Sequence, residues 1–172
     1  RVGYDMYLKL LEEAVLEERG ETPPVQTECA ADLSVAASIP DRYVPSPEQR
    51  MDLYRRLAAI RSEADADDLT DELIDRYGDP PRSVNNLISV ALLRSDAARC
   101  GISEISQKGM SLNFYLTRFD LQQVSALCGQ YQGRLLFSAG EKPYLALRLK
   151  KGEDALKLGR KLVERYAKLA GE

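Results

Sequence analysis

The sequence contains no histidine among its 172 residues. Histidine is the usual general base near neutral pH and the commonest metal ligand in proteins. A serine or cysteine nucleophile in this chain therefore has no imidazole to activate it, which excludes triad chemistry. The three cysteines, Cys29, Cys100 and Cys128, are odd in number and widely spaced. This pattern matches neither a disulfide framework nor a zinc site, and it indicates a reducing compartment.

Long apolar runs are also missing. No segment approaches the roughly eighteen consecutive apolar residues of a membrane-spanning helix, and the opening RVGYDMYLKLLEEAV lacks the apolar core of a secretory signal. We therefore expect a cytoplasmic protein with no membrane contact. The chain lacks an initiator methionine and opens directly into a helical pattern, so we expect it to be a segment of a longer protein. Its 44% of hydrophobic residues are enough to bury a core.

Neither of the common nucleotide-binding loops, GxxxxGK[ST] and GxGxxG, is present. Acidic residues number 27, and this abundance removes the information in any one carboxylate pair, because charged helix faces are usually just solvated. A histidine-free enzyme built on two carboxylates is the least favoured alternative, and it requires a deep pocket that raises their pKa values. The sequence thus indicates no catalytic residue, no metal site and no cofactor.

What the chain does contain is a strong asymmetry of charge. Residues 1–80 carry 9 Lys/Arg against 19 Asp/Glu, whereas residues 142–168 carry 9 Lys/Arg against 3 Asp/Glu. Opposite fields of this kind steer partners of opposite sign. The basic segment has five cations that one broad helix face can carry: Lys157, Arg160, Lys161, Arg165 and Lys168. They predict either contact with nucleic-acid phosphates or a helix whose late cations favour its own C-terminal dipole.

Hydrophobic periodicity predicts an α+β fold, helix-rich in its N-terminal part and followed by a small mixed sheet with packed helices. Helices are expected over residues 4–19, from Pro47, over 67–77, over 82–100, from Asp120 and over 152–169. Strands are expected over residues 29–40 and in two hairpins that turn near Gly109 and Gly140.

Start and stop signals accompany several of these elements. Ser46 is a good N-cap for the helix that begins at Pro47, and Gln49 is expected to complete a capping box with it. Gly78 is expected to end the helix over 67–77. The last helix is expected to bury Leu158, Leu162, Tyr166 and Leu169.

The segment 68–81, DLTDELIDRYGDPP, is dense in charge for the end of a helix. At about 100° per residue, one side gathers Leu69, Leu73, Ile74 and Tyr77. The other side gathers Asp68, Asp71, Glu72, Asp75 and Arg76. Glu72 and Arg76 stand four residues apart and are expected to pair. This face is either an ordinary solvated surface or a docking surface on which Arg76 meets a partner's carboxylate, and the pattern alone leaves both readings open.

A family resemblance adds to this reading. The run IPDRYVPSPEQRMDLYRRLAAIRS, followed by DELIDRYGDPP and a long helix ending in CGIS, resembles the C-terminal regulatory (TRCF) domain of the bacterial transcription-repair coupling factor (Mfd). The resemblance is specific over residues 2–105. It implies that residues 1–20 form the helix leaving a translocase module, residues 21–27 a linker, and residues 28–172 the regulatory domain.

That family is an ATP-driven DNA translocase that displaces stalled RNA polymerase and recruits the excision-repair protein UvrA. The resemblance implies that this chain is non-catalytic and autoinhibitory. It would dock on the UvrB-like N-terminal module, mask the UvrA-binding surface and restrain the motor. By the same resemblance, the docking positions are Glu72, Asp75 and Arg76, and Tyr77 stands where phenylalanine is familiar. The alternative is a nucleic-acid-binding module that uses the basic segment 142–168.

Overall fold

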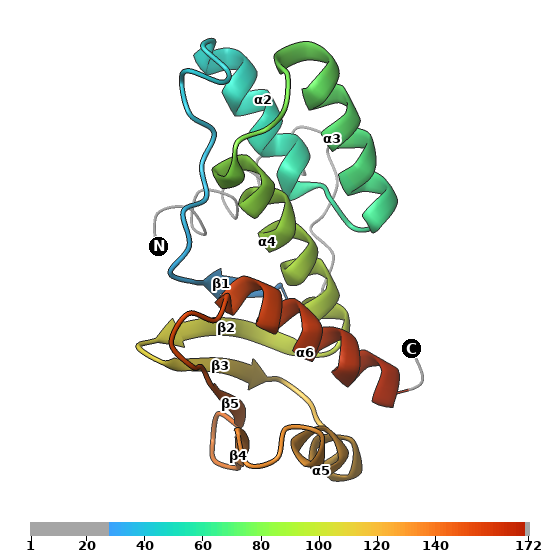
Figure 1. Ribbon diagram of the computed structural model, residues 1–172. Helices are drawn as coiled ribbons and strands as arrows, with labels where there is room; N and C mark the ends of the chain where they lie inside the picture. The colour runs from blue at the N-terminus through green and yellow to red at the C-terminus, as the bar shows by residue number, and fades with distance from the viewer. Residues whose placement is uncertain (1–27, 171–172) are drawn as a thin grey trace. The chain divides into compact units, whose positions relative to one another are not determined.

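The computed structural model of the protein describes residues 28–170 (Figure 1). The helix expected over 1–20 and the linker expected over 21–27 lie outside the described residues. The described chain divides into two compact units, a helical unit of residues 35–95 and a sheet unit of residues 28–34 with 96–170. Helices and a mixed five-stranded sheet confirm the predicted α+β class.

The helical unit is built from three helices around one apolar core. They are α2 (Pro47–Ala58), α3 (Glu63–Tyr77) and α4 (Arg82–Arg99), of which this unit contains α4 up to Ser95. Each helix buries one stripe at helical spacing. The three helices each contribute core side chains that are at most 3% exposed: Leu53 and Leu57 of α2, Leu69 and Leu73 of α3, and Val84 and Leu87 of α4.

Side-chain caps set the first turns of two of these helices. The Ser46 hydroxyl accepts the Gln49 N–H at 3.2 Å, so the predicted start of α2 is confirmed. The Ser62 hydroxyl accepts the Asp65 N–H at 3.2 Å, so α3 begins at Glu63 and not at the predicted residue 67. Its first turn has little apolar periodicity to reveal it, because Ala66 is its one buried residue.

The strand predicted over residues 29–40 is wrong in length. β1 spans Ala30–Asp32, where it pairs in parallel with residues 104–106. Ser34 still donates its N–H to Gln107 Oε1 at 2.9 Å, and beyond Ser34 the backbone finds helix partners instead of a neighbouring strand. Ser38 donates its N–H to the Ser83 carbonyl at 3.3 Å, and Ile39 donates its N–H to the Tyr54 hydroxyl at 3.1 Å.

The sheet unit has the strand order β1-β2-β3-β5-β4. Its other strands are β2 (Ile102–Lys108), β3 (Ser111–Leu116), β4 (Leu135–Ser138) and β5 (Tyr144–Arg148). Apart from the parallel β1–β2 pair, neighbours run antiparallel. Both predicted hairpins are therefore confirmed, and Gly109 has the positive φ of 59° that its turn requires.

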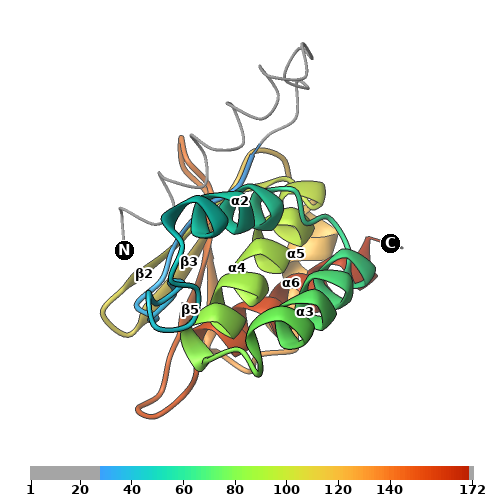
Figure 2. The same cartoon turned by 90° about the horizontal axis from the view of Figure 1, so that it is seen from above.

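Two helices, α5 (Leu121–Gly129) and α6 (Ala155–Leu169), lie on the same side of this sheet (Figure 2). In-register residues Ile105, Phe114 and Leu145 are fully buried, as are Leu112 and Leu147. The Asp120 carboxylate caps α5 by accepting the Gln122 N–H at 2.8 Å, as the predicted start of this helix requires.

The predicted buried face of α6 is correct in part. Leu162 and Tyr166 are buried and Leu158 is half-buried, but Leu169 is 37% exposed. Leu169 is the last residue of α6, and it lines an open hollow of about 320 Å³ together with Asp120 and Gln123. The helical pattern of apolar residues extends to Leu169. Among residues 28–170, however, the packing that buries Leu162 and Tyr166 does not bury Leu169.

Replacing Gly78 with alanine is expected to destabilise the helical unit. Gly78 ends α3 with φ 86° and ψ −172°, a region that residues with a Cβ avoid. No atom lies within 4 Å of the position that a Cβ would take, so the cost is backbone strain, about 1–3 kcal/mol. Urea denaturation followed by circular dichroism measures this loss.

Gly129→Ala is the matched control, because that position also has open space for a Cβ but lies at the end of a helix. It is expected to leave stability unchanged or raise it by up to about 1 kcal/mol. Equal losses for the two variants would contradict the assignment of strain to Gly78.

Candidate functional site

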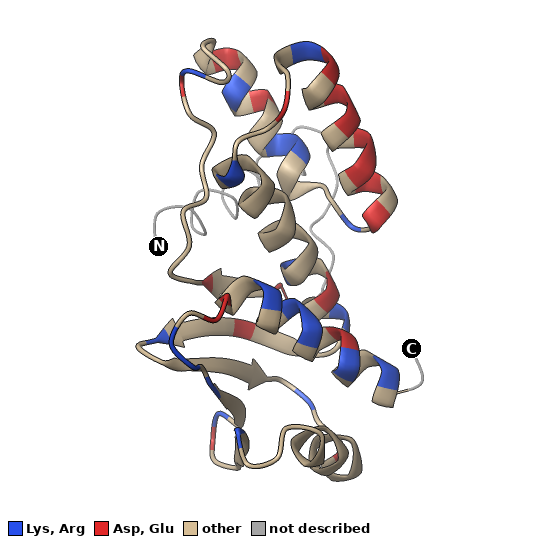
Figure 3. Ribbon diagram, viewed as in Figure 1, with Lys and Arg blue, Asp and Glu red and all other residues tan. Residues whose placement is uncertain are grey.

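Of the three candidate docking residues on α3, Asp75 and Arg76 are exposed, and Glu72 lies at the edge that faces α2. Ala66, Leu69 and Leu73 are buried in the core of the helical unit, which turns the opposite side of the helix to solvent. Asp75 and Arg76 are exposed there. Figure 3 shows acidic residues recurring along α3, and Arg76 is the one cation of this helix.

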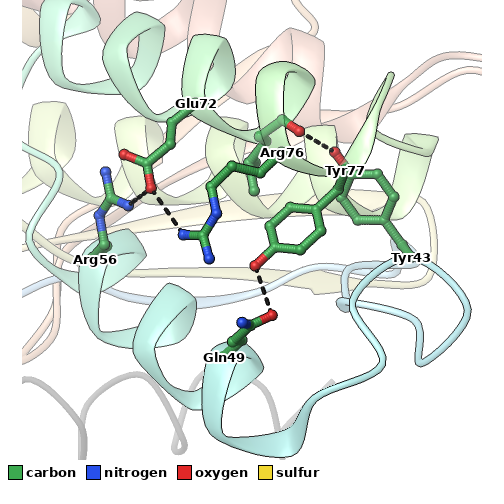
Figure 4. Close-up of polar contacts among 7 residues, drawn as sticks. Tyr43, Gln49, Arg56, Glu72, Arg76 and Tyr77 are labelled. Atoms are coloured by element: carbon green, nitrogen blue, oxygen red, sulfur yellow. Dashed lines mark hydrogen bonds and ion pairs between the residues drawn. The ribbon is translucent and has the colours of Figure 1, made fainter.

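Glu72 joins α3 to the neighbouring helix α2. Its Oε2 accepts a hydrogen bond from Arg56 Nη1 at 2.6 Å and another from Arg76 Nη1 at 3.3 Å (Figure 4). The predicted pairing of Glu72 with Arg76 is therefore confirmed, but the shorter contact is the one to Arg56. One carboxylate oxygen thus holds two guanidinium groups.

These contacts change the acidity of Glu72. The hydrogen bond from Arg56 holds the pKa of the Glu72 carboxyl below its usual value, and Arg76 adds to the effect, while partial desolvation opposes it. The carboxylate therefore stays ionised throughout the neutral range. Arg56 in turn has its pKa raised, chiefly by the same hydrogen bond.

Arg76 is held from a second direction by an aromatic cluster. Its guanidinium carbon lies 5.2 Å from the centre of the Tyr77 ring, within the range of a cation–π contact. Tyr77 donates its hydroxyl to Gln49 Oε1 at 2.9 Å, and its ring lies 5.7 Å from that of Tyr43. The Arg76 side chain keeps 45% of its surface exposed, so it is positioned and still accessible.

The contact with Tyr77 corrects the expected capping box. The Gln49 side-chain oxygen accepts from the Tyr77 hydroxyl, where a capping box would direct it back to the N–H of Ser46. A phenylalanine at position 77 has no hydroxyl to donate. The tyrosine of this chain therefore ties the end of α3 to the start of α2.

Asp75 differs from its two neighbours in the site. Its side chain is exposed and forms no hydrogen bond or ion pair with another residue of 28–170. Ile74, which the helical pattern assigned to the apolar side, is 45% exposed. The outer side of α3 therefore offers a carboxylate, a positioned guanidinium and one apolar side chain. Such a set suits a partner surface that carries charges of both signs.

Sequence reasoning missed Arg56, Tyr43 and Gln49 as members of this cluster. Arg56 and Glu72 are 16 residues apart, and they meet because α2 and α3 pack side by side. The Arg55–Arg56 pair beside an acidic helix was the available signal, but helical spacing within one helix does not predict which residues meet across two.

The second group of predicted residues lies on α6. Lys157, Lys161 and Lys168 are exposed, and Arg160 and Arg165 are half-buried. All five share the side of α6 that faces away from its buried residues.

A hollow of about 260 Å³ in the sheet unit lies near Cys100, Arg118 and Tyr166. Among the described residues its lining has one carboxylate, Asp120, which is engaged as the cap of α5. Burial raises the pKa of the Tyr166 hydroxyl to about 12. Within residues 28–170, the lining of this hollow therefore does not supply the carboxylate pair that the histidine-free enzyme alternative requires.

Residues 28–170 also bear on two other kinds of site, membrane-spanning helices and metal centres. No helix in that range has the length and apolarity to cross a membrane. Within the same range, His, Cys, Asp and Glu side chains form no group of three that could hold a metal ion.

Comparison with known proteins decides the family. The sequence model of the TRCF domain matches residues 33–126, more than half of the chain. The chain belongs to the TRCF domain family. The matched range contains the helical unit, and therefore Glu72 and the residues that surround it: Tyr43, Gln49, Arg56, Arg76 and Tyr77.

Several relatives of this chain carry the name transcription-repair-coupling factor. One from Staphylococcus epidermidis is 34% identical over 118 residues, which is 67% of this chain and 10% of the relative. One from Myxococcus xanthus is 43% identical over 95 residues, which is 55% of this chain and 8% of the relative. The chain thus spans about a tenth of the length of the curated relatives that it matches.

The fold has a counterpart among solved structures. A crystal structure of the C-terminal domain of transcription-repair coupling factor superposes with a TM-score of 0.75 at 17% identity, covering 86% of this chain and 97% of the other. At that identity the match bears on the fold alone. It supports the same TRCF architecture for the described residues.

Removing Arg56 is expected to raise the pKa of Glu72 toward its ordinary value. Because the folded pKa is depressed, Glu72 adds stability above its unfolded pKa of about 4.3, and this stability is lost as pH falls through the folded value. Carboxyl-detected NMR titration of Arg56→Gln should show a clear upward shift, and Arg76→Gln a smaller one. Arg82→Gln serves as the control, and an unchanged Glu72 titration in Arg56→Gln would contradict the contact.

Proposed function

We propose that this chain is a non-catalytic, autoinhibitory domain of a transcription-repair coupling DNA translocase. It docks on the UvrB-like N-terminal module of the longer protein, masks the surface that binds UvrA and restrains the motor until RNA polymerase is engaged. Membership of the TRCF domain family supports this role at the level of the whole protein.

The observation that carries the proposal is the division of roles among Glu72, Asp75 and Arg76. Glu72 is occupied by contacts within the unit, whereas Asp75 is exposed without such a contact. Arg76 is fixed by Glu72 and Tyr77 and keeps donors for a bidentate bond to a partner's carboxylate. A side chain that is already positioned loses less conformational entropy on binding.

The chemistry of this face suits a contact that can be released. Charged contacts at the rim of an interface fix its register, and water can replace them more readily than it replaces a large apolar interface. An inhibitor that must open requires a closed state favoured by only a few kcal/mol. Asp75, Arg76 and the partly exposed Ile74 supply a contact of that modest kind.

Reversing the charge of Asp75 is expected to weaken docking by about tenfold or more, because it places a cation where the partner's cation sits. The measurement is calorimetric titration of this chain into the separately produced UvrB-like module. Asp75→Lys is the cleanest variant, since it disturbs no ion pair inside the helical unit. Arg76→Glu should weaken docking as well, and it also removes the contact with Glu72.

Glu104→Lys is the matched control, because Glu104 is exposed on β2 in the other unit and the change in charge is the same. Its dissociation constant should stay within about twofold of the wild-type value, because salt screens charges that lie far from the contact. Equal binding by Asp75→Lys and wild type would move the contact away from α3. If wild type does not bind in trans, the two modules are joined by a linker, and capture of UvrA by the fused pair is compared with and without Asp75→Lys.

A further inference from the structure

The exposed side of α6 is predominantly basic. Five cations lie on it, Lys157, Arg160, Lys161, Arg165 and Lys168, and Figure 3 shows basic residues recurring along the helix. Glu164 is the one carboxylate within Ala155–Leu169. The first and last of the five cations are eleven residues apart, which corresponds to about 16 Å along a helix.

Among residues 28–170, three acidic groups are close to this surface in sequence, and two of them are engaged by other partners. Glu164 pairs with Lys161 at 3.5 Å, with both side chains more than half exposed. Glu153 is engaged elsewhere, accepting the Lys150 N–H and Arg134 Nη2, each at 2.6 Å, and these contacts lower the pKa of its carboxyl. Asp154 accepts the N–H groups of the first turn of α6 as its N-cap.

The helix that carries the cations is firmly seated. Leu162, Val163 and Tyr166 are at most 1% exposed on its inner side, and Gln123 of α5 donates to the Tyr166 carbonyl at 2.7 Å. Arg165 is positioned further by the Tyr131 ring, whose centre lies 5.2 Å from its guanidinium carbon. The cations therefore project from a rigid element, which suits a partner with regularly spaced charges.

We propose that the exposed side of α6 binds the phosphate backbone of double-stranded DNA. A basic span of about 16 Å exceeds the 12 Å width of a major groove, so its ends reach phosphates on both strands. The surface has no tyrosine, tryptophan or phenylalanine among the exposed residues of α6. It therefore lacks the aromatic anchor typical of a protein interface and the stacking platform typical of single-strand binders.

The charge of the sheet unit as a whole favours the same partner. Residues 26–34 and 96–172 carry 13 Lys/Arg against 10 Asp/Glu, a net charge of +3, although the whole chain is at −3. Binding of this kind is independent of base sequence, because cations on phosphates read no base edges. It is also independent of the docking role proposed for α3.

The test is fluorescence anisotropy of a labelled 20-base-pair duplex titrated with the full 172-residue chain at several salt concentrations. If four phosphates are neutralised, the logarithm of the binding constant falls against the logarithm of salt with a slope of about −4. Lys157→Glu with Lys161→Glu should weaken binding at low salt by about tenfold or more and make the slope shallower by about 2.

Two further variants guard against misfolding and against a general charge effect. Arg42→Glu with Lys108→Glu makes the same change in net charge at exposed positions outside residues 142–168, and it should alter binding by no more than about twofold to threefold. Glu164→Gln removes the one carboxylate of the surface and should strengthen binding by about twofold to threefold, a gain that a damaged fold does not produce.

The proposal is overturned if the wild-type chain fails to bind the duplex at the lowest salt, or if the two double variants lose affinity equally. Tighter binding to a single strand of the same length would overturn the assignment to duplex DNA. Binding to polyglutamate without binding to DNA would assign the surface to an acidic protein instead.

Discussion

Burial of the apolar stripe of α3 is the constraint on which the rest of the helical unit depends. Ala66, Leu69 and Leu73 share one core with side chains of α2 and α4, and their burial sets the rotation of α3 about its axis. Once that rotation is set, Asp75 must point to solvent and Glu72 must lie at the edge facing α2. The charged cluster is thus a consequence of apolar packing. The free energy that holds it in place comes mainly from burial, because exposed ion pairs contribute little.

The cluster also resolves a local conflict in the sequence. α3 carries seven carboxylates against one cation, and several of them lie late in the helix, where they oppose the helix dipole. Arg56 of α2 offsets part of this repulsion through Glu72, and Gly78 ends the helix immediately after the site. The three charged residues of the site therefore have different roles. Glu72 stabilises the helix pair, Arg76 is held by it, and Asp75 remains available to a partner.

The sheet unit follows the same physical rule with the opposite charge. α6 buries one side against the sheet and presents Lys157, Lys161 and Lys168 on the other. An amphipathic helix needs polar residues on its outer side, but it does not require them all to have one sign. The predominance of one sign of charge on the outer side of α3, and of the opposite sign on α6, therefore goes beyond what folding needs, and each is the basis of a proposal for a different class of partner.

Much of this fold was within reach of the sequence, because helical and strand periodicity, N-caps and glycine stops are local properties. The starts of α2 and α5, the end of α3 at Gly78 and both hairpins are set by residues within one turn of the boundary. Pattern alone also predicted that Glu72 and Arg76 pair along one helix. Tertiary structure decided what lies between elements: that β1 stops at Asp32, that Leu169 is exposed, and that Arg56 shares the Glu72 carboxylate. Each of these depends on which surfaces meet in space. Arg56 pairs with Glu72 across 16 positions, and Ala31 pairs with Ile105 across 74 positions. Nothing in the local sequence around either residue predicts such a pairing.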